Sequence, residues 1–142
     1  MRLWHKDLIS VLPRQQLLGQ WRECCAIAKN IYTKGSPNHI LVNKIMEYHI
    51  DNFILYSYKV YSEMFNRNYN VDWKKFKKWV YVPNNKLVYH DSYDLEKIFL
   101  DWHNDRYLNQ CYYNLQEKYD CGGITEKEWK LIYNKFKEQI YD

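Results

Sequence analysis

Glu23 lies in a stretch whose residue types could form a site for an anionic ligand. If this stretch is helical, positions advance by about 100° each. Glu23 then lies opposite the apolar side, in one row with the small residues Gly19 and Ala26, and Arg22 occupies the adjoining row. A carboxylate with open space and a cation beside it is compatible with a cleft that binds an anion. The same pattern also fits an ordinary solvated helix face.

The segment that carries Glu23 is predicted to be an amphipathic helix over residues 13–32. Apolar residues recur at spacings of four and three, which places them on one side of a helix. They are Leu17, Trp21, Cys24, Ala28 and Ile31. Pro13 suits a first-turn position, and the Gly, Ser, Pro and Asn of residues 35–38 end the helix with turn chemistry.

Three more long helices are predicted to position this segment, over residues 42–66, 104–118 and 125–140. Asn104 is a candidate N-cap, and Thr125 followed by Glu128 forms a capping box. The second of these helices has an inward face made of Ile45, His49, Phe53, Tyr56, Val60 and Met64. Residues 72–79 predict a short basic-aromatic helix, and residues 83–85 predict a turn.

The composition indicates an all-α, compact single-domain bundle with long loops over residues 1–142. Hydrophobic residues make up 46% of the chain, so it should fold around one core. Gly and Pro are scarce, with 4 and 3 residues, which disfavours an all-β fold rich in tight turns. The net charge of +4 permits a nucleic-acid partner without requiring one.

The apolar and cysteine patterns argue against a membrane-spanning, secreted or metal-binding protein. No stretch approaches the roughly 20 apolar residues that cross a bilayer, and the N-terminus lacks the apolar core of a signal peptide. A cytoplasmic protein with reduced thiols is expected. The cysteines lack metal-ligand spacing, so they are predicted to be buried free thiols, and no metal or cofactor is expected. They are Cys24, Cys25, Cys111 and Cys121.

The chain carries Leu8, Ser10, Leu12, Gln15, Leu17, Arg22 and Glu23, which resemble without a gap the opening of the phage endonuclease V-type pyrimidine-dimer DNA glycosylases. Residues 12–25, with the sequence LPRQQLLGQWRECC, are still more similar to the bacterial relatives of that family. The resemblance is specific over about the first 30 residues. It continues at residues 68–71, which resemble the turn after the family's second helix. His103 and Asn104 resemble the entry to its third helix, and the aromatic C-terminus is also similar.

The resemblance implies that the chain's own α-amine acts as a nucleophile. In the family this amine attacks C1′ of the damaged nucleotide, displaces the base and forms an imine, after which β-elimination nicks the strand. An α-amine has a reference pKa of about 7.7–8.0, against about 10.4 for lysine, so a useful fraction is neutral near pH 7.5. Arg2 is too large for ordinary removal of the initiator Met, so the retained Met1 would supply the amine. Glu23 would support the sugar chemistry.

The resemblance also implies which residues contact DNA. DNA would be bound by cationic and polar residues of the matched region, of which Arg2 and Arg22 would hold phosphates. The full set is Arg2, Arg14, Gln15 and Arg22. Two positions depart from the phage pattern, because a histidine of its motif is Gln16 here and a nearby basic residue is Ala26. Both departures leave the identity of the lesion open.

The leading hypothesis is a DNA-repair glycosylase with abasic-site lyase activity on pyrimidine dimers. It would act as a monomer on double-stranded damaged DNA, without metal, cofactor or membrane. Two alternatives remain: a catalytically silent DNA- or protein-binding module on the same scaffold, and a glycosylase or lyase for another lesion. The aromatics of residues 73–79 either stack on exposed bases or point into the core.

Overall fold

The computed structural model describes residues 1–80 and 97–140, and within these residues the chain forms helices and no strand. This confirms the predicted all-α class. The elements in chain order are η1 (Lys6–Val11), α1 (Arg14–Lys34), η2 (Asn43–Glu47), α2 (Ile50–Asn66), α3 (Lys74–Lys77), α4 (Asp105–Asp120) and α5 (Glu126–Phe136). No helix in the described part of the chain is long and apolar enough to cross a membrane.

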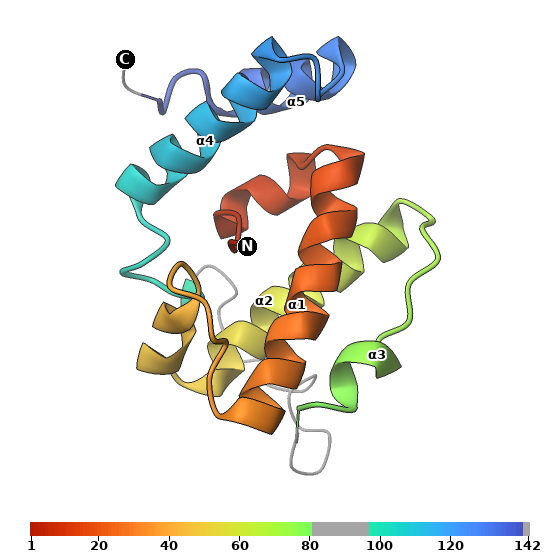
Figure 1. The fold of residues 1–142 in the computed structure, drawn as a ribbon. Helices are drawn as coiled ribbons and strands as arrows, with labels where there is room; N and C mark the ends of the chain where they lie inside the picture. The colour runs from red at the N-terminus through yellow and green to blue at the C-terminus, as the bar shows by residue number, and fades with distance from the viewer. Residues whose placement is uncertain (81–96, 141–142) are drawn as a thin grey trace.

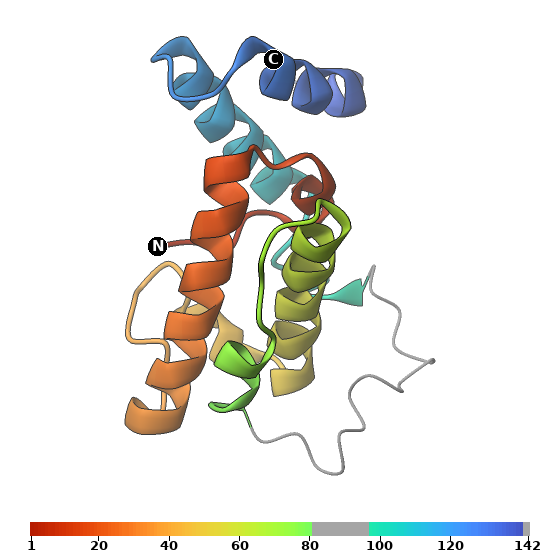
Figure 2. The same cartoon turned by 90° about the vertical axis from the view of Figure 1, so that its right-hand side faces the viewer.

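The helices form two groups with the N-terminus between them. The helix α1 packs against α2 and α3, and α4 and α5 form a hairpin that contacts η1 through α5. The first residues, red in Figure 1, run through the interior between these groups. Figure 2 shows the α4–α5 hairpin across one end of the layer that α1, α2 and α3 form. The chain start is therefore surrounded by parts of the protein that are distant in sequence.

The helix α1 is the rigid element that carries Glu23, and its prediction is confirmed within two residues at each end. The predicted apolar stripe is buried, apart from Ile31, which is half-buried. Gly35 ends the helix in the left-handed conformation, with φ 80°, and its N–H bonds the carbonyl of Ile31 at 3.0 Å. This is the conformation that glycine adopts without steric cost.

The prediction of one continuous helix over residues 42–66 is wrong in its first part. A short 3₁₀ helix, η2, comes first; the chain is then extended at Tyr48, and α2 begins only at Ile50. His49 caps α2 because its Nδ1 accepts a hydrogen bond of 3.2 Å from the Asp51 amide. Its side chain is 71% exposed and does not belong to the inward face. The cap replaces the helical hydrogen bonds that a continuous helix would make there.

The structure also tests the predicted helix caps and the short basic-aromatic helix. Asn104 caps α4, and Thr125 and Glu128 form the predicted capping box of α5, although α5 ends earlier than expected. Phe76 of α3 is fully buried, with its ring 5.5 Å from that of Phe53, so the core interpretation of residues 73–79 holds for this ring. The predicted turn at residues 83–85 lies outside the described residues.

Candidate active site

The N-terminal segment, residues 2–6, is half-buried at Arg2 and buried from Leu3 to Lys6, although chain termini are ordinarily exposed and mobile. Leu3, Trp4 and His5 are 0%, 6% and 3% exposed, whereas Met1 is 39% exposed. A buried backbone must find partners for its N–H and C=O groups. In this protein those partners are side chains from α1, α2 and α4 and from the turn before α4. The chain start is thus fixed in place while its first residue reaches solvent.

Gln20 of α1 is the centre of this arrangement. Its Nε2 donates to the carbonyl of Arg2 at 3.0 Å, and its Oε1 accepts from the amide of Trp4 at 2.7 Å. The side-chain amide therefore pairs with the segment much as a neighbouring strand would. Gln20 is 1% exposed, so these bonds form away from competing water.

Two tyrosine hydroxyls and one imidazole hold the other side of the N-terminal segment. Tyr56 of α2 donates to the carbonyl of Trp4, with Gln20 Oε1 as a second acceptor at 3.0 Å. Tyr107 of α4 donates to the carbonyl of Leu3. Burial raises the pKa of both tyrosines above the ordinary value, so both hydroxyls stay protonated as donors.

His103, just before α4, accepts a hydrogen bond of 2.9 Å at Nδ1 from the amide of Lys6. Its Nε2 is buried and has no hydrogen-bond partner among the described residues. The rings of His103 and His5 lie 5.2 Å apart. Burial, and then the neighbouring His5, hold the pKa of His103 far below its ordinary value, so the imidazole is neutral and accepts at Nδ1.

Glu23 lies one turn beyond Gln20 on α1, beside the start of the chain. Its Oε2 accepts from the backbone amide of Arg2 at 3.4 Å, and its side chain is half-buried. Because consecutive Cα atoms are about 3.8 Å apart, the amine of Met1 begins one residue from this carboxylate. The structure therefore brings Met1, Arg2 and Glu23 together.

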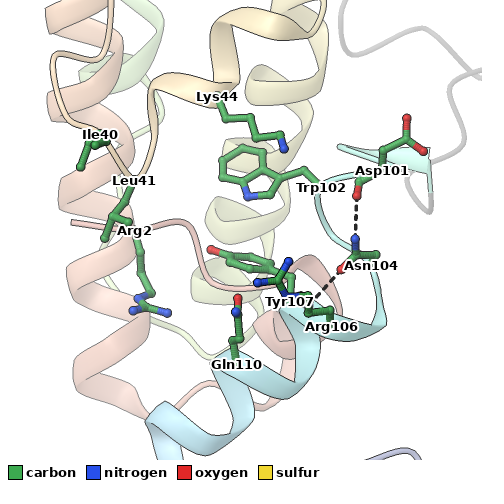
Figure 3. A pocket seen from close by; sticks show the side chains of 10 residues that line it. All are labelled: Arg2, Ile40, Leu41, Lys44, Asp101, Trp102, Asn104, Arg106, Tyr107 and Gln110. Atoms are coloured by element: carbon green, nitrogen blue, oxygen red, sulfur yellow. Dashed lines mark hydrogen bonds between the residues drawn. The ribbon is translucent and has the colours of Figure 1, made fainter.

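A cationic pocket opens beside this point, with a volume of about 360 Å³. It is lined by Arg2, Ile40, Leu41, Lys44, Asp101, Trp102, Asn104, Arg106, Tyr107 and Gln110. Three of these side chains are cations and one is a carboxylate, so the pocket favours an anion. Figure 3 shows Arg2 on the wall opposite the α4 residues Tyr107 and Gln110. Tyr107 belongs both to this wall and to the set of side chains that holds the N-terminal segment.

Comparison with known protein families gives one match. The model of the family described as pyrimidine dimer DNA glycosylase matches residues 1–77, more than half of the chain. The chain belongs to the pyrimidine dimer DNA glycosylase family. It is therefore a DNA-repair glycosylase that acts on damaged DNA. The comparisons with curated proteins and with solved structures returned no match.

The part that matches the glycosylase family contains Glu23 and Gln20 but only part of the site. Residues 1–77 include η1, α1, η2, α2 and α3. His103 and Tyr107, which hold the N-terminal segment, and Arg106, which lines the cationic pocket, lie beyond it. In this glycosylase the later helices therefore complete a site whose first half the family model covers.

The other predicted DNA-binding residues of the glycosylase lie along α1. Arg22 is exposed, and its Nη2 would lie 3.8 Å from a Cβ at Gly19, so the guanidinium extends back over that glycine. Arg14 and Gln15 are at the start of α1 and line a separate pocket of about 420 Å³. Arg14 also covers the ring of Tyr69 at 4.8 Å. The structure does not bring these two residues to the pocket of Arg2.

Most of the residues that hold the N-terminal segment of the glycosylase could not be predicted from the sequence. Gln20 carried a signal, because it is a polar residue three positions after Leu17 and four before Cys24, inside the apolar stripe. A buried amide in that position must be hydrogen-bonded. The apolar spacing predicts Tyr56 on an inward face, but nothing local indicates what its hydroxyl or that of Tyr107 binds.

The cysteines are all free thiols at different depths. Cys24 and Cys111 are buried as predicted, Cys25 is half-buried, and Cys121 is exposed, contrary to the prediction. Cys121 is the residue that ends α4, where the chain turns at the surface. Burial raises the pKa of Cys24 and Cys111, so neither is a reactive thiolate.

Proposed function

We propose that this glycosylase cleaves pyrimidine-dimer DNA with the α-amine of Met1 as nucleophile and Glu23 as the acid–base group, and that it then nicks the strand as an abasic-site lyase. The observation that carries the proposal is the buried N-terminal segment. Side chains of Gln20, Tyr56, Tyr107 and His103 bind its backbone, and the free end emerges beside the carboxylate of Glu23, which accepts from the Arg2 amide.

This arrangement suits covalent catalysis because the backbone next to the nucleophile is held before the substrate binds. A flexible terminus loses orientational freedom when it reacts, whereas an amine one residue from a held backbone avoids part of that loss. The cationic pocket adjoins the same point and would hold the phosphates that flank the damaged nucleotide through Arg2, Lys44 and Arg106. Arg22, Arg14 and Gln15 would contact the backbone farther along α1.

The chemistry needs only groups that the chain supplies. The neutral amine forms a bond to C1′ as the bond from C1′ to the base breaks, and the base leaves with the electron pair and takes up a proton. Loss of the remaining amine proton and opening of the sugar ring give an imine. Removal of a proton from C2′ then expels the 3′ phosphate. Glu23 is placed to move these protons and to stabilise positive charge on the sugar.

Borohydride trapping tests the proposal, because it reduces the imine to a stable crosslink that mass spectrometry can locate. The substrates are a duplex with one cyclobutane pyrimidine dimer and a matched duplex with an abasic site. We expect a crosslink to the α-amine of Met1 on both. The intact mass of the protein, measured alongside, tests whether Met1 is the free amino terminus.

The other outcomes select the alternatives. A crosslink on the abasic duplex alone would retain the lyase and assign the glycosylase to another lesion. Crosslinking at a lysine would remove the terminal amine from the mechanism. A folded protein with a free terminus that binds damaged DNA but gives no crosslink on either duplex would be a binding module.

A further inference from the structure

The turn that connects α1 to η2 presents two apolar side chains to solvent. Ile40 is 87% exposed and Leu41 is 52% exposed. Their neighbours are anchored, because Pro37 is buried on one side and Val42 is 0% exposed on the other. Single exposed apolar residues are common on proteins. Two adjacent ones between buried anchors form a small apolar projection.

Hydrogen bonds fix this turn in one conformation. The carbonyl of His39 accepts from the amides of Val42 at 3.0 Å and Asn43 at 2.8 Å, and its Nδ1 accepts from the amide of Leu41 at 3.2 Å. The side-chain oxygen of Asn43 accepts from the His39 amide at 2.9 Å, and Asn30 of α1 donates to the Pro37 carbonyl at 3.1 Å. Because the turn is rigid, the two apolar side chains do not need to be ordered when they meet a partner.

The surroundings of the Ile40/Leu41 pair indicate which partner that is. Both side chains line the cationic pocket, together with Arg2, Lys44 and Arg106. In Figure 3 Leu41 lies beside Arg2, whose backbone amide bonds Glu23. Cations around an apolar projection complement a strand of phosphates with stacked bases behind it. A hydrophobic protein partner would instead leave three cations beside the interface with only Asp101 as a counter-charge.

We propose that Ile40 and Leu41 form a wedge that enters the base stack of the DNA duplex next to the lesion, while the cations of the pocket hold the flanking phosphates. This inference rests on the proposed function, since it places damaged DNA at the same site. Apolar side chains inserted at a base step unstack it and kink the duplex. The wedge would thus open the damaged strand at the point where the sugar must reach the amine of Met1.

The test is aminopurine fluorescence, which rises when this adenine analogue loses its stacked neighbours. The probe is placed beside a tetrahydrofuran abasic analogue in a duplex, so no imine can form and the signal is independent of the chemistry. The double variant Ile40→Ala/Leu41→Ala is compared with the wild type. Leu131→Ala on α5 is the matched control, because Leu131 is 57% exposed and lies outside the cationic pocket.

We expect the double variant to lose most of the fluorescence rise and to cleave the dimer duplex about tenfold more slowly. It should still be trapped on a single-stranded abasic oligonucleotide at the wild-type level, because no stack has to be opened there. Leu131→Ala should match the wild type in every assay. Equal thermal unfolding of the three proteins would show that the changes are local.

Three results would overturn the wedge. The first is a full rise in aminopurine fluorescence with the double variant, and the second is a wild-type protein that binds the duplex without any rise in fluorescence. The third is a double variant whose mass in sedimentation is lower than that of the wild type. The last would identify the pair as a contact between copies of this chain. Failure of the proposed function would give a different result, because the wild-type protein would then form no borohydride crosslink. The aminopurine fluorescence would still test the wedge in that case.

Discussion

The side chain of Gln20 and the backbone of Trp4 are joined by a hydrogen bond of 2.7 Å, which fixes the N-terminal segment on α1. Replacing Gln20 with Met keeps the side-chain volume but removes the hydrogen-bond partner of the Trp4 amide and of the Arg2 carbonyl. We expect the free energy of unfolding to fall by about 2–4 kcal/mol. Urea denaturation measures this change.

The turnover of the same variant should fall by more than the lost stability explains, because the N-terminal segment that positions the amine of Met1 is no longer held by Gln20. Trapping rates at a temperature where both proteins are fully folded separate the two effects. Gln116→Met, in the later part of α4, is a control for the substitution itself. A Gln20→Met protein that is trapped at the wild-type rate would show that the terminus needs no fixed position.

Glu23→Gln removes the charge but keeps an oxygen that can accept from the Arg2 amide. Turnover on the dimer duplex is expected to fall by about 10²–10⁴-fold, the usual contribution of a positioned acid–base group, while binding persists. Single-turnover cleavage and a gel-shift titration measure the two quantities. Glu117→Gln on the exposed face of α4 is the control. Turnover at the wild-type level would remove Glu23 from the mechanism.

Lys44 and Arg106 line the cationic pocket without taking part in holding the N-terminal segment. If each contacts one phosphate, Lys44→Gln and Arg106→Gln should each reduce the slope of log binding constant against log salt by about 0.9. Lys130→Gln on α5 is the control, because Lys130 is 67% exposed and pairs with Glu126. Slopes that are the same in all four proteins would place the DNA on another face.

The buried histidines predict a loss of stability in mild acid. Burial, more than any neighbour, lowers the pKa of His103 and His5 below the ordinary 6.5 in the folded state. The unfolded chain therefore takes up protons first as the pH falls. The free energy of unfolding has its full value above about pH 6.5. Below that pH it declines by at most about 1.4 kcal/mol per pH unit for each histidine.

Urea denaturation at intervals from pH 7 to pH 5 measures this decline before most carboxylates titrate. His103→Asn should show a shallower decline than the wild type, whatever its stability at pH 7, because one of the two titrating groups is gone. A free energy of unfolding that stays constant across this interval would contradict the neutral, buried state of both imidazoles.

The elements that the sequence predicted well are those that local pattern determines. The apolar stripe of α1, its end at Gly35 and the capping box at Thr125 all depend on residues within a few positions of one another. The break before α2 was missed because apolar spacing continues through it, and because His49 is an uncommon N-cap residue.

The candidate site was predictable only in part, for a related reason. The family resemblance located Glu23 and Met1. The bond from Lys6 to His103 spans 97 positions, and that from Tyr107 to Leu3 spans 104. No periodic pattern encodes contacts at that separation, so the side chains that hold the chain start became visible only in the structure.

The carboxylate of Glu128 links the start of α5 to the start of α1. Its Oε1 closes the capping box of α5 with Thr125, and its Oε2 accepts from the Arg14 amide at the first turn of α1. Partial burial raises the pKa of Glu128, but these hydrogen bonds outweigh it and lower the pKa overall. A fragment that stops at residue 77, where the family similarity ends, would lose this shared cap. The stretch that matches the family model is therefore shorter than the part of the chain that forms this cap.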